Sequence, residues 1–123
     1  MIVLDTHVLV WWTADPAQLS GPADRALSTA DRIGVPAIVF WEVAILARRK
    51  RIDLGARIDE WVRDVLSIRR IEPLHLTPVI AIEAESLAMH ADPADRFIVA
   101  TARHYGADLV TKDRSLRALD LVP

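Results

Sequence analysis

Short apolar runs alternate with stretches of helical periodicity along the whole chain. The apolar runs at residues 1–4, 33–35, 71–76 and 108–112 have the length and the flanking turn signals of strands. Between them, apolar residues recur at three- and four-residue spacing, which predicts helices near residues 6–13, 22–32, 37–47, 58–66, 79–89 and 92–105. This alternation predicts an α/β fold in which a small, mainly parallel sheet is flanked by helices on both sides.

Pro73 lies inside the predicted strand at residues 71–76. Because proline has no backbone N–H to donate to a neighbouring strand, this strand is expected at an edge of the sheet or in an irregular position.

Length and composition limit the kind of protein further. A chain of 123 residues with 52% hydrophobic side chains suits one domain over residues 1–123 and is too short for two ordinary ones. No cysteine is present, which excludes disulfides and thiolate metal sites and is compatible with a cytoplasmic location. No apolar run approaches the roughly 18 residues that span a bilayer, and no basic region precedes the first apolar run, so we expect neither a membrane segment nor a cleaved signal.

Four acidic residues interrupt the apolar pattern, namely Asp5, Glu42, Asp95 and Asp113. All four lie within or at the ends of segments that otherwise have the character of buried core, where carboxylates are rare unless something positive meets them. Glu42 is the only polar side chain in residues 37–47. Taken alone, Glu42 is explained equally well by an arginine partner, by a local hydrogen bond or by a bound cation.

The other acids favour a shared site. Asp5 and Asp113 follow predicted strands, and sites in α/β proteins form outside the carboxyl ends of the strands, although a single Asp there is more often a turn residue or a helix cap. Asp92 and Pro93 have the pattern of a helix N-cap and first residue, so Asp92 is interpreted as a cap before a ligand. Asp95 falls in the first turn, where the helix dipole favours it and where its carboxylate can point into a cleft.

Several carboxylates that are brought together repel one another unless they are protonated or bind a divalent cation. With oxygen ligands and no cysteine, Mg²⁺ is the predicted cation and Mn²⁺ is an alternative, whereas Zn²⁺ prefers His and Cys. Such a cation activates water and neutralises charge on a phosphate oxygen, which favours hydrolysis of phosphodiesters. The four histidines do not form a metal-binding pair, and only His7, close to Asp5, is expected to border the site.

The charge distribution is compatible with a phosphodiester substrate but does not require one. The net charge is −2, yet basic residues gather in the middle third at Arg48, Arg49, Lys50, Arg51, Arg57, Arg63, Arg69 and Arg70. A basic edge beside an acidic pocket suits a nucleic-acid backbone, whereas for residues 48–51 alone a solvated helix end is slightly favoured. The tryptophans could stack on bases, but their apolar neighbours favour the core or a subunit interface for Trp11, Trp12, Trp41 and Trp61.

Four motifs in this order and at these separations resemble those of PIN-domain proteins, and specifically the VapC-type toxin ribonucleases of bacterial toxin–antitoxin pairs. The motifs are Leu4-Asp5-Thr6-His7, Trp41-Glu42-Val43-Ala44, Asp92-Pro93-Ala94-Asp95-Arg96 and Leu109-Val110-Thr111-Lys112-Asp113. The resemblance implies a PIN-like three-layer sandwich and a metal pocket made of Asp5, Glu42, Asp95 and Asp113. It further implies that the hydroxyls of Thr6 and Thr111 support these acids.

The same resemblance implies Mg²⁺- or Mn²⁺-dependent endonucleolytic cleavage of RNA, a homodimer, and inhibition by a cognate antitoxin. Arg96 is expected to pair with an acid or to contact substrate, with pairing preferred. One departure from the family pattern is Val39-Phe40 where a Ser or Thr often precedes the central Glu, which puts a hydroxyl contact near Glu42 in doubt. Two alternatives remain open at this point: a metal-dependent phosphoesterase that acts on DNA or small phosphate esters, and a non-catalytic cation-binding interaction domain.

Overall fold

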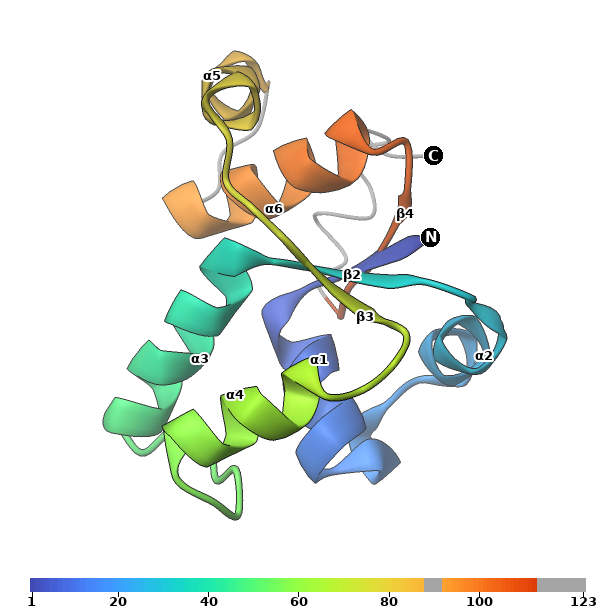
Figure 1. Ribbon diagram of the computed structural model, residues 1–123, viewed down its shortest axis with the longest axis vertical. Coiled ribbons are helices and arrows are strands. Elements are labelled where there is room, and N and C mark those ends of the chain that lie inside the picture. Colours follow the sequence, from blue (N-terminus) through green and yellow to red (C-terminus); the bar gives the residue numbers. More distant parts are fainter. Residues whose placement is uncertain (88–91, 113–123) are drawn as a thin grey trace.

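The computed structural model describes residues 1–87 and 92–112. In these ranges the strands form one sheet in the order β3-β2-β1-β4, and all neighbouring strands are parallel (Figure 1). The strands are β1 (Ile2–Leu4), β2 (Ile33–Pro36), β3 (Ile71–Leu74) and β4 (Asp108–Val110). The predicted small parallel sheet is therefore confirmed, and β3 lies at an edge as Pro73 predicts.

Helices cover both faces of this sheet (Figure 1). They are α1 (Thr6–Ala14), α2 (Gly21–Thr29), α3 (Ala37–Arg48), α4 (Ile58–Leu66), α5 (Pro78–Ser86) and α6 (Pro93–His104), with a short 3₁₀ turn η1 (Pro16–Gln18). Figure 1 shows α5 and α6 on one side of the sheet and α1, α3 and α4 on the other. The expected three-layer α/β sandwich is confirmed.

Four predicted elements end earlier than expected. The helix predicted over residues 22–32 ends at Thr29, and the strand predicted over residues 108–112 ends at Val110. The helix predicted to reach residue 89 ends at Ser86, because Leu87 has an extended backbone with ψ of 130°. The strand predicted to reach residue 76 ends at Leu74, and Thr77 then caps α5 by accepting a hydrogen bond from the Ile80 amide at 3.3 Å. At both ends of α5, residues that the apolar pattern places inside a helix or strand instead form the cap of the helix.

The core lies on both sides of the central strand β1. Leu4 is fully buried and packs with Val8 of α1 and Val39 of α3, whereas Val3 points the opposite way and packs with Ala102 of α6. This alternation is what a strand buried on both faces requires. Because β1 is held from both sides, the residue that follows it has a fixed position.

No helix in the described ranges is long and apolar enough to cross a membrane.

Candidate metal centre

Asp5 occupies the point where the central strand β1 passes into α1. Its backbone N–H donates to the Val110 carbonyl at 3.0 Å, so the residue is tied to the end of β4. The side chain is only 8% exposed, and both of its oxygens accept hydrogen bonds. The Thr6 backbone N–H donates to Oδ1 at 2.7 Å, and the Thr111 hydroxyl donates to Oδ2 at 2.5 Å. These bonds fix the orientation of the Asp5 carboxylate.

The position of Asp5 in the sheet suits a ligand site. The strand that follows β1 in the sequence, β2, pairs with one edge of β1, whereas β4 pairs with the opposite edge. Ligands of open parallel sheets bind at such a change of direction, outside the carboxyl ends of the strands. Asp5 follows β1 and Thr111 follows β4, so their hydrogen bond lies at this point.

Glu42 lies on α3, where Val39 and Val43 on either side of it in sequence are fully buried and anchor the helix. The half-buried Glu42 carboxylate accepts a hydrogen bond at 2.6 Å from the Thr6 hydroxyl to Oε1. Thr6 therefore holds two acids, with its amide on Asp5 and its hydroxyl on Glu42. The hydroxyl contact that Val39 and Phe40 put in doubt is supplied from α1 instead.

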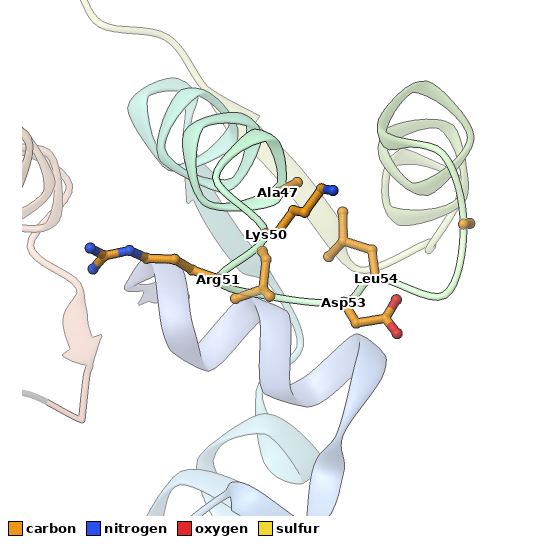
Figure 2. A pocket seen from close by; sticks show the side chains of 7 residues that line it. Ala47, Lys50, Arg51, Asp53 and Leu54 are labelled. Atoms are coloured by element: carbon orange, nitrogen blue, oxygen red, sulfur yellow. The ribbon is translucent and has the colours of Figure 1, made fainter.

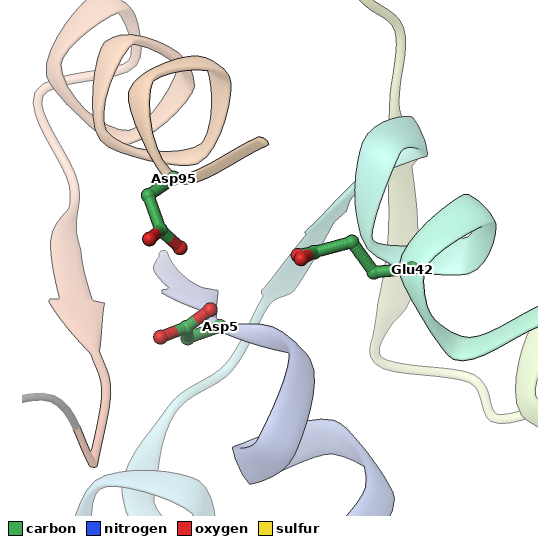
Figure 3. A group of neighbouring side chains, drawn as sticks. All are labelled: Asp5, Glu42 and Asp95. Atoms are coloured by element: carbon green, nitrogen blue, oxygen red, sulfur yellow. The ribbon is translucent and has the colours of Figure 1, made fainter. Parts of the chain in front are cut away.

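Asp95 approaches from the opposite layer of the sandwich, in the first turn of α6. The Asp92 side chain caps this helix by accepting a hydrogen bond from the Asp95 amide at 2.9 Å. Figure 3 shows the carboxylates of Asp5, Glu42 and Asp95 facing one another from three different elements. One oxygen from each lies within 4.8 Å of the others.

Other candidate residues fall around this group. Asp113 lies outside the described residues. Arg96 donates to the Ala84 carbonyl at 3.1 Å and lies 3.8 Å from the Glu85 carboxylate, which ties α6 to α5. His7 follows Thr6 directly in α1 and borders the site, close enough for the charges of Asp5 and Lys112 to shift its pKa.

The electrostatics of the group favour a positively charged ligand. Burial raises the pKa of Glu42, and the negative charges of Asp5 and Asp92 raise it further, against the hydrogen bond from Thr6. The pKa of His7 is lowered by burial and by Lys112, so the imidazole is neutral near pH 7 and supplies no positive charge. Among the residues that the structure describes, no ion pair involves Asp5 or Glu42.

The donor set fits a divalent cation. All three side chains offer hard carboxylate oxygens, the ligands that Mg²⁺ and Mn²⁺ prefer. Opposite ligands of an octahedral Mg²⁺ lie about 4.2 Å apart, since each bond is about 2.1 Å long. The observed limit of 4.8 Å is slightly larger, so small side-chain movements bring the three oxygens to a shared ion.

The comparisons with known proteins agree with this architecture. The family model of the PIN domain matches residues 2–121. This chain belongs to the PIN-domain family. Within it the chain is of the VapC type, because it is 40% identical over 119 residues to Ribonuclease VapC22 of Mycobacterium tuberculosis. That alignment covers 95% of this PIN-domain chain and 90% of the relative. The family predicted from the four motifs is confirmed.

Solved structures share the fold of this PIN domain at lower sequence identity. Mycobacterium tuberculosis VapC20, described as a Sarcin-Ricin loop cleaving toxin, has a TM-score of 0.73 at 20% identity, over 99% of this chain and 97% of that one. VapBC2 from Rickettsia felis, bound to a DNA fragment from its promoter, has a TM-score of 0.70 at 17% identity, over 99% and 96%. At these identities the likeness shows the common fold.

The structure divides the basic residues that the sequence groups together. The Arg70 guanidinium donates to the carbonyls of Leu27 and Ala30 at 2.7 and 2.8 Å and lies 5.8 Å from the centroid of the Trp12 ring. Arg70 therefore joins β3 to α2 and is a structural residue. Arg32, which lies outside that group, also makes a structural contact, a two-pronged salt bridge with Glu72 of β3.

Of the two positions predicted for the tryptophans, core or subunit interface, the structure excludes the core for Trp41. Trp61 is 5% exposed and belongs to the core, as its apolar neighbours predict. Trp41, in contrast, is 57% exposed on α3 and is not a core residue. It immediately precedes Glu42, and this adjacency to an acid was the one available signal that its environment differs.

Proposed function

We propose that this chain is a divalent-cation-dependent endoribonuclease that acts as the toxin of a toxin–antitoxin pair, and that residues 1–123 form a single PIN-like domain. The observation that carries the proposal is the convergence of Asp5, Glu42 and Asp95 from three elements of a PIN fold. The identity of 40% to a protein named as a ribonuclease supports RNA as the substrate.

In this proposal Asp5, Glu42 and Asp95 hold the principal cation, and Asp113 either completes the site or holds a second cation through water. The cation is Mg²⁺, with Mn²⁺ as an alternative. When bound, it supplies an activated water and neutralises charge on the phosphate that is attacked. The products expected are a 5′-phosphate and a 3′-hydroxyl.

The remaining residues position the acids. Thr6 holds Asp5 and Glu42 in one arrangement, and Thr111 fixes the second oxygen of Asp5. Arg96 anchors α6 against α5 and thereby steadies the turn that carries Asp95. Loss of such supporting contacts typically lowers metal affinity or activity by about tenfold to a hundredfold.

A cognate antitoxin is the expected protein partner, and the cytoplasm is the expected location. The support comes from structures with the same fold, among them a toxin-antitoxin complex from Klebsiella pneumoniae with a TM-score of 0.70. A homodimer is also part of the proposal. Its support is the helix α5, which exposes the apolar side chains of Val79 and Ile82.

The substrate class is tested by comparing three substrates under Mg²⁺: a pool of cellular RNA, single-stranded DNA of matched length and a generic phosphate ester. The proposal predicts discrete cuts in RNA alone. Cleavage of DNA or of the ester at comparable rates would support a broader phosphoesterase. Cation binding without turnover of any of the three would support a non-catalytic interaction domain.

A further inference from the structure

A hollow of about 380 Å³ opens beside Glu42, one of the three converging carboxylates. Its walls are one face of α3 and residues 92–94 at the start of α6. Glu42 is both a member of the carboxylate group and a wall of this hollow. The hollow, which we call the α3–α6 groove, therefore adjoins the carboxylate group at Glu42.

The α3 wall has an aromatic residue at one end and a cation at the other. Trp41, Ile45 and Arg49 follow one another at four-residue spacing and line the same groove, so they share one face of the helix. They extend over about 12 Å of the helix axis, at about 1.5 Å per residue. The Trp41 side chain is 57% exposed, and Arg49 is also exposed.

We propose that the α3–α6 groove binds the RNA strand next to the scissile phosphate, with Trp41 stacking on a base and Arg49 contacting a backbone phosphate. This inference rests on the proposed ribonuclease function and adds the place where the strand lies. Single strands are bound by exposed aromatic rings that stack on bases, together with cations that follow the backbone. The groove combines both groups and shares Glu42 with the carboxylate group.

The position of the groove beside Glu42, with an exposed ring and a cation on one wall, favours a nucleic acid over a second copy of the chain. Among the described residues, the most exposed large apolar side chains are Val79 and Ile82 on α5, a surface suited to a protein contact. The helix α6 packs between α5 and α3 and separates that surface from the groove (Figure 1). The groove has Trp41 at one end and Arg49 at the other, with apolar residues between them and two acids on its walls, namely Ile45, Leu46, Glu42 and Asp92.

The first test measures binding of a fluorescently labelled single-stranded RNA to the full chain in an Asp5→Asn background, which keeps the strand intact. Trp41→Ala is expected to weaken binding by about tenfold, because one stacked base is lost. Trp41→Phe retains a ring and is expected to stay within about threefold of the parent. The matched control is Tyr105→Ala, which removes another exposed aromatic side chain at the opposite end of α6.

The second test separates the phosphate contact from general electrostatics. Arg49→Gln is expected to lower the slope of log Kd against log salt concentration by about 0.7, the value for one phosphate contact on a single strand. Arg51→Gln makes the same change of charge nearby. Arg51 lines a different hollow, of about 550 Å³, with Lys50 and Asp53 (Figure 2), so the control should change the slope much less.

Three results would overturn the inference. Unchanged RNA affinity in Trp41→Ala would show that Trp41 does not stack on a base. Equal slopes for the two arginine variants would show that Arg49 does not contact a phosphate. Loss of dimerisation by Trp41→Ala at unchanged RNA affinity would instead assign the groove to a second copy of the chain. RNA binding and RNA cleavage are separate readouts. If the ribonuclease proposal alone is wrong, the wild-type chain binds RNA in a Trp41-dependent manner but does not cut it.

Discussion

At the scale of single residues, Thr6 organises the site more than any other described side chain. Its amide holds Asp5 and its hydroxyl holds Glu42, and it is only 3% exposed. We expect Thr6→Val to lower Mg²⁺ affinity by about tenfold, because Glu42 loses the hydrogen bond that orients it. Thr6→Ser keeps the hydroxyl and should bind Mg²⁺ like the parent, as calorimetric titration would show. Equal affinities for Thr6→Val and the parent would contradict this role.

The charge of Glu42 makes the stability of the metal-free protein dependent on pH. Burial raises the pKa of Glu42 above its ordinary value of 4.5, so the folded state binds this proton more tightly than the unfolded state does. The contribution of Glu42 is therefore fully present below pH 4.5 and is lost as the pH rises through the raised pKa.

Denaturant unfolding at a series of pH values measures this effect. Without metal, the free energy of unfolding of Glu42→Gln should fall less than that of the parent as the pH rises from about 4.5 toward neutrality. Saturating Mg²⁺ should stabilise the parent at neutral pH much more than the variant. Identical pH profiles for the two proteins would mean that Glu42 is not held in a proton-binding environment.

Candidate acids can be picked out in the sequence where polarity conflicts with its surroundings. Asp5 and Glu42 stand out because they interrupt apolar runs, and the structure brings them together with Asp95. The bridge through Thr6 to Glu42 joins residues on two different helices, so no local pattern encodes it. The apolar neighbours of Trp41 favour core or a subunit interface, but adjacent residues on a helix face different directions, and the structure excludes the core for Trp41.

At the scale of elements, the start of α6 combines a structural acid with a candidate ligand. Asp92 caps the helix, whereas Asp95 points to the other carboxylates. We expect Asp92→Ala to destabilise the protein by about 1 kcal/mol through loss of the cap, and Asp92→Asn to keep the cap and the stability. Thermal unfolding would measure both.

Metal titration of the same helix start distinguishes cap from ligand. Asp95→Asn should abolish tight Mg²⁺ binding, since a neutral amide replaces a carboxylate ligand. Asp92→Asn should retain affinity within about threefold, because it removes only a nearby charge. A loss in Asp92→Asn as large as that in Asp95→Asn would identify Asp92 as a ligand.

Elements were predicted well where hydrophobic periodicity and punctuation agree. Pro73 placed β3 at the sheet edge, and Asp92 with Pro93 placed the start of α6, because each residue has one dominant physical effect on the backbone. Helix and strand ends were less accurate. Leu76 and Thr77 continue an extended pattern locally, but Thr77 is used to cap α5.

At the scale of the whole molecule, α5 presents the surface expected to join two copies. Val79 and Ile82 are 61% and 75% exposed, which is costly for a face left in water. If this face forms a homodimer, Ile82→Asp should shift the chain toward monomer, as light scattering after gel filtration would show. An equally charged change elsewhere, Ser28→Asp on the exposed face of α2, should leave the mass unchanged. A monomeric parent chain would contradict the proposed homodimer.

The order of the strands could not be obtained from periodicity. The sequence predicts parallel strands, but which strands are neighbours depends on how helices pack over both faces. The order β3-β2-β1-β4 places β1 at the centre and brings Thr111 to Asp5 across 106 positions of sequence. The site is thus a product of topology, and only its individual residues were predictable from local patterns.

The central claim is that the converging carboxylates form a metal-dependent ribonuclease site. The most direct test incubates the purified chain, freed of any antitoxin, with a cellular RNA pool with and without Mg²⁺ or Mn²⁺, beside the Asp5→Asn variant. We predict discrete cuts that require the metal and are lost in Asp5→Asn while its thermal unfolding stays cooperative. Cuts that persist in the folded variant, or without metal, would contradict the claim.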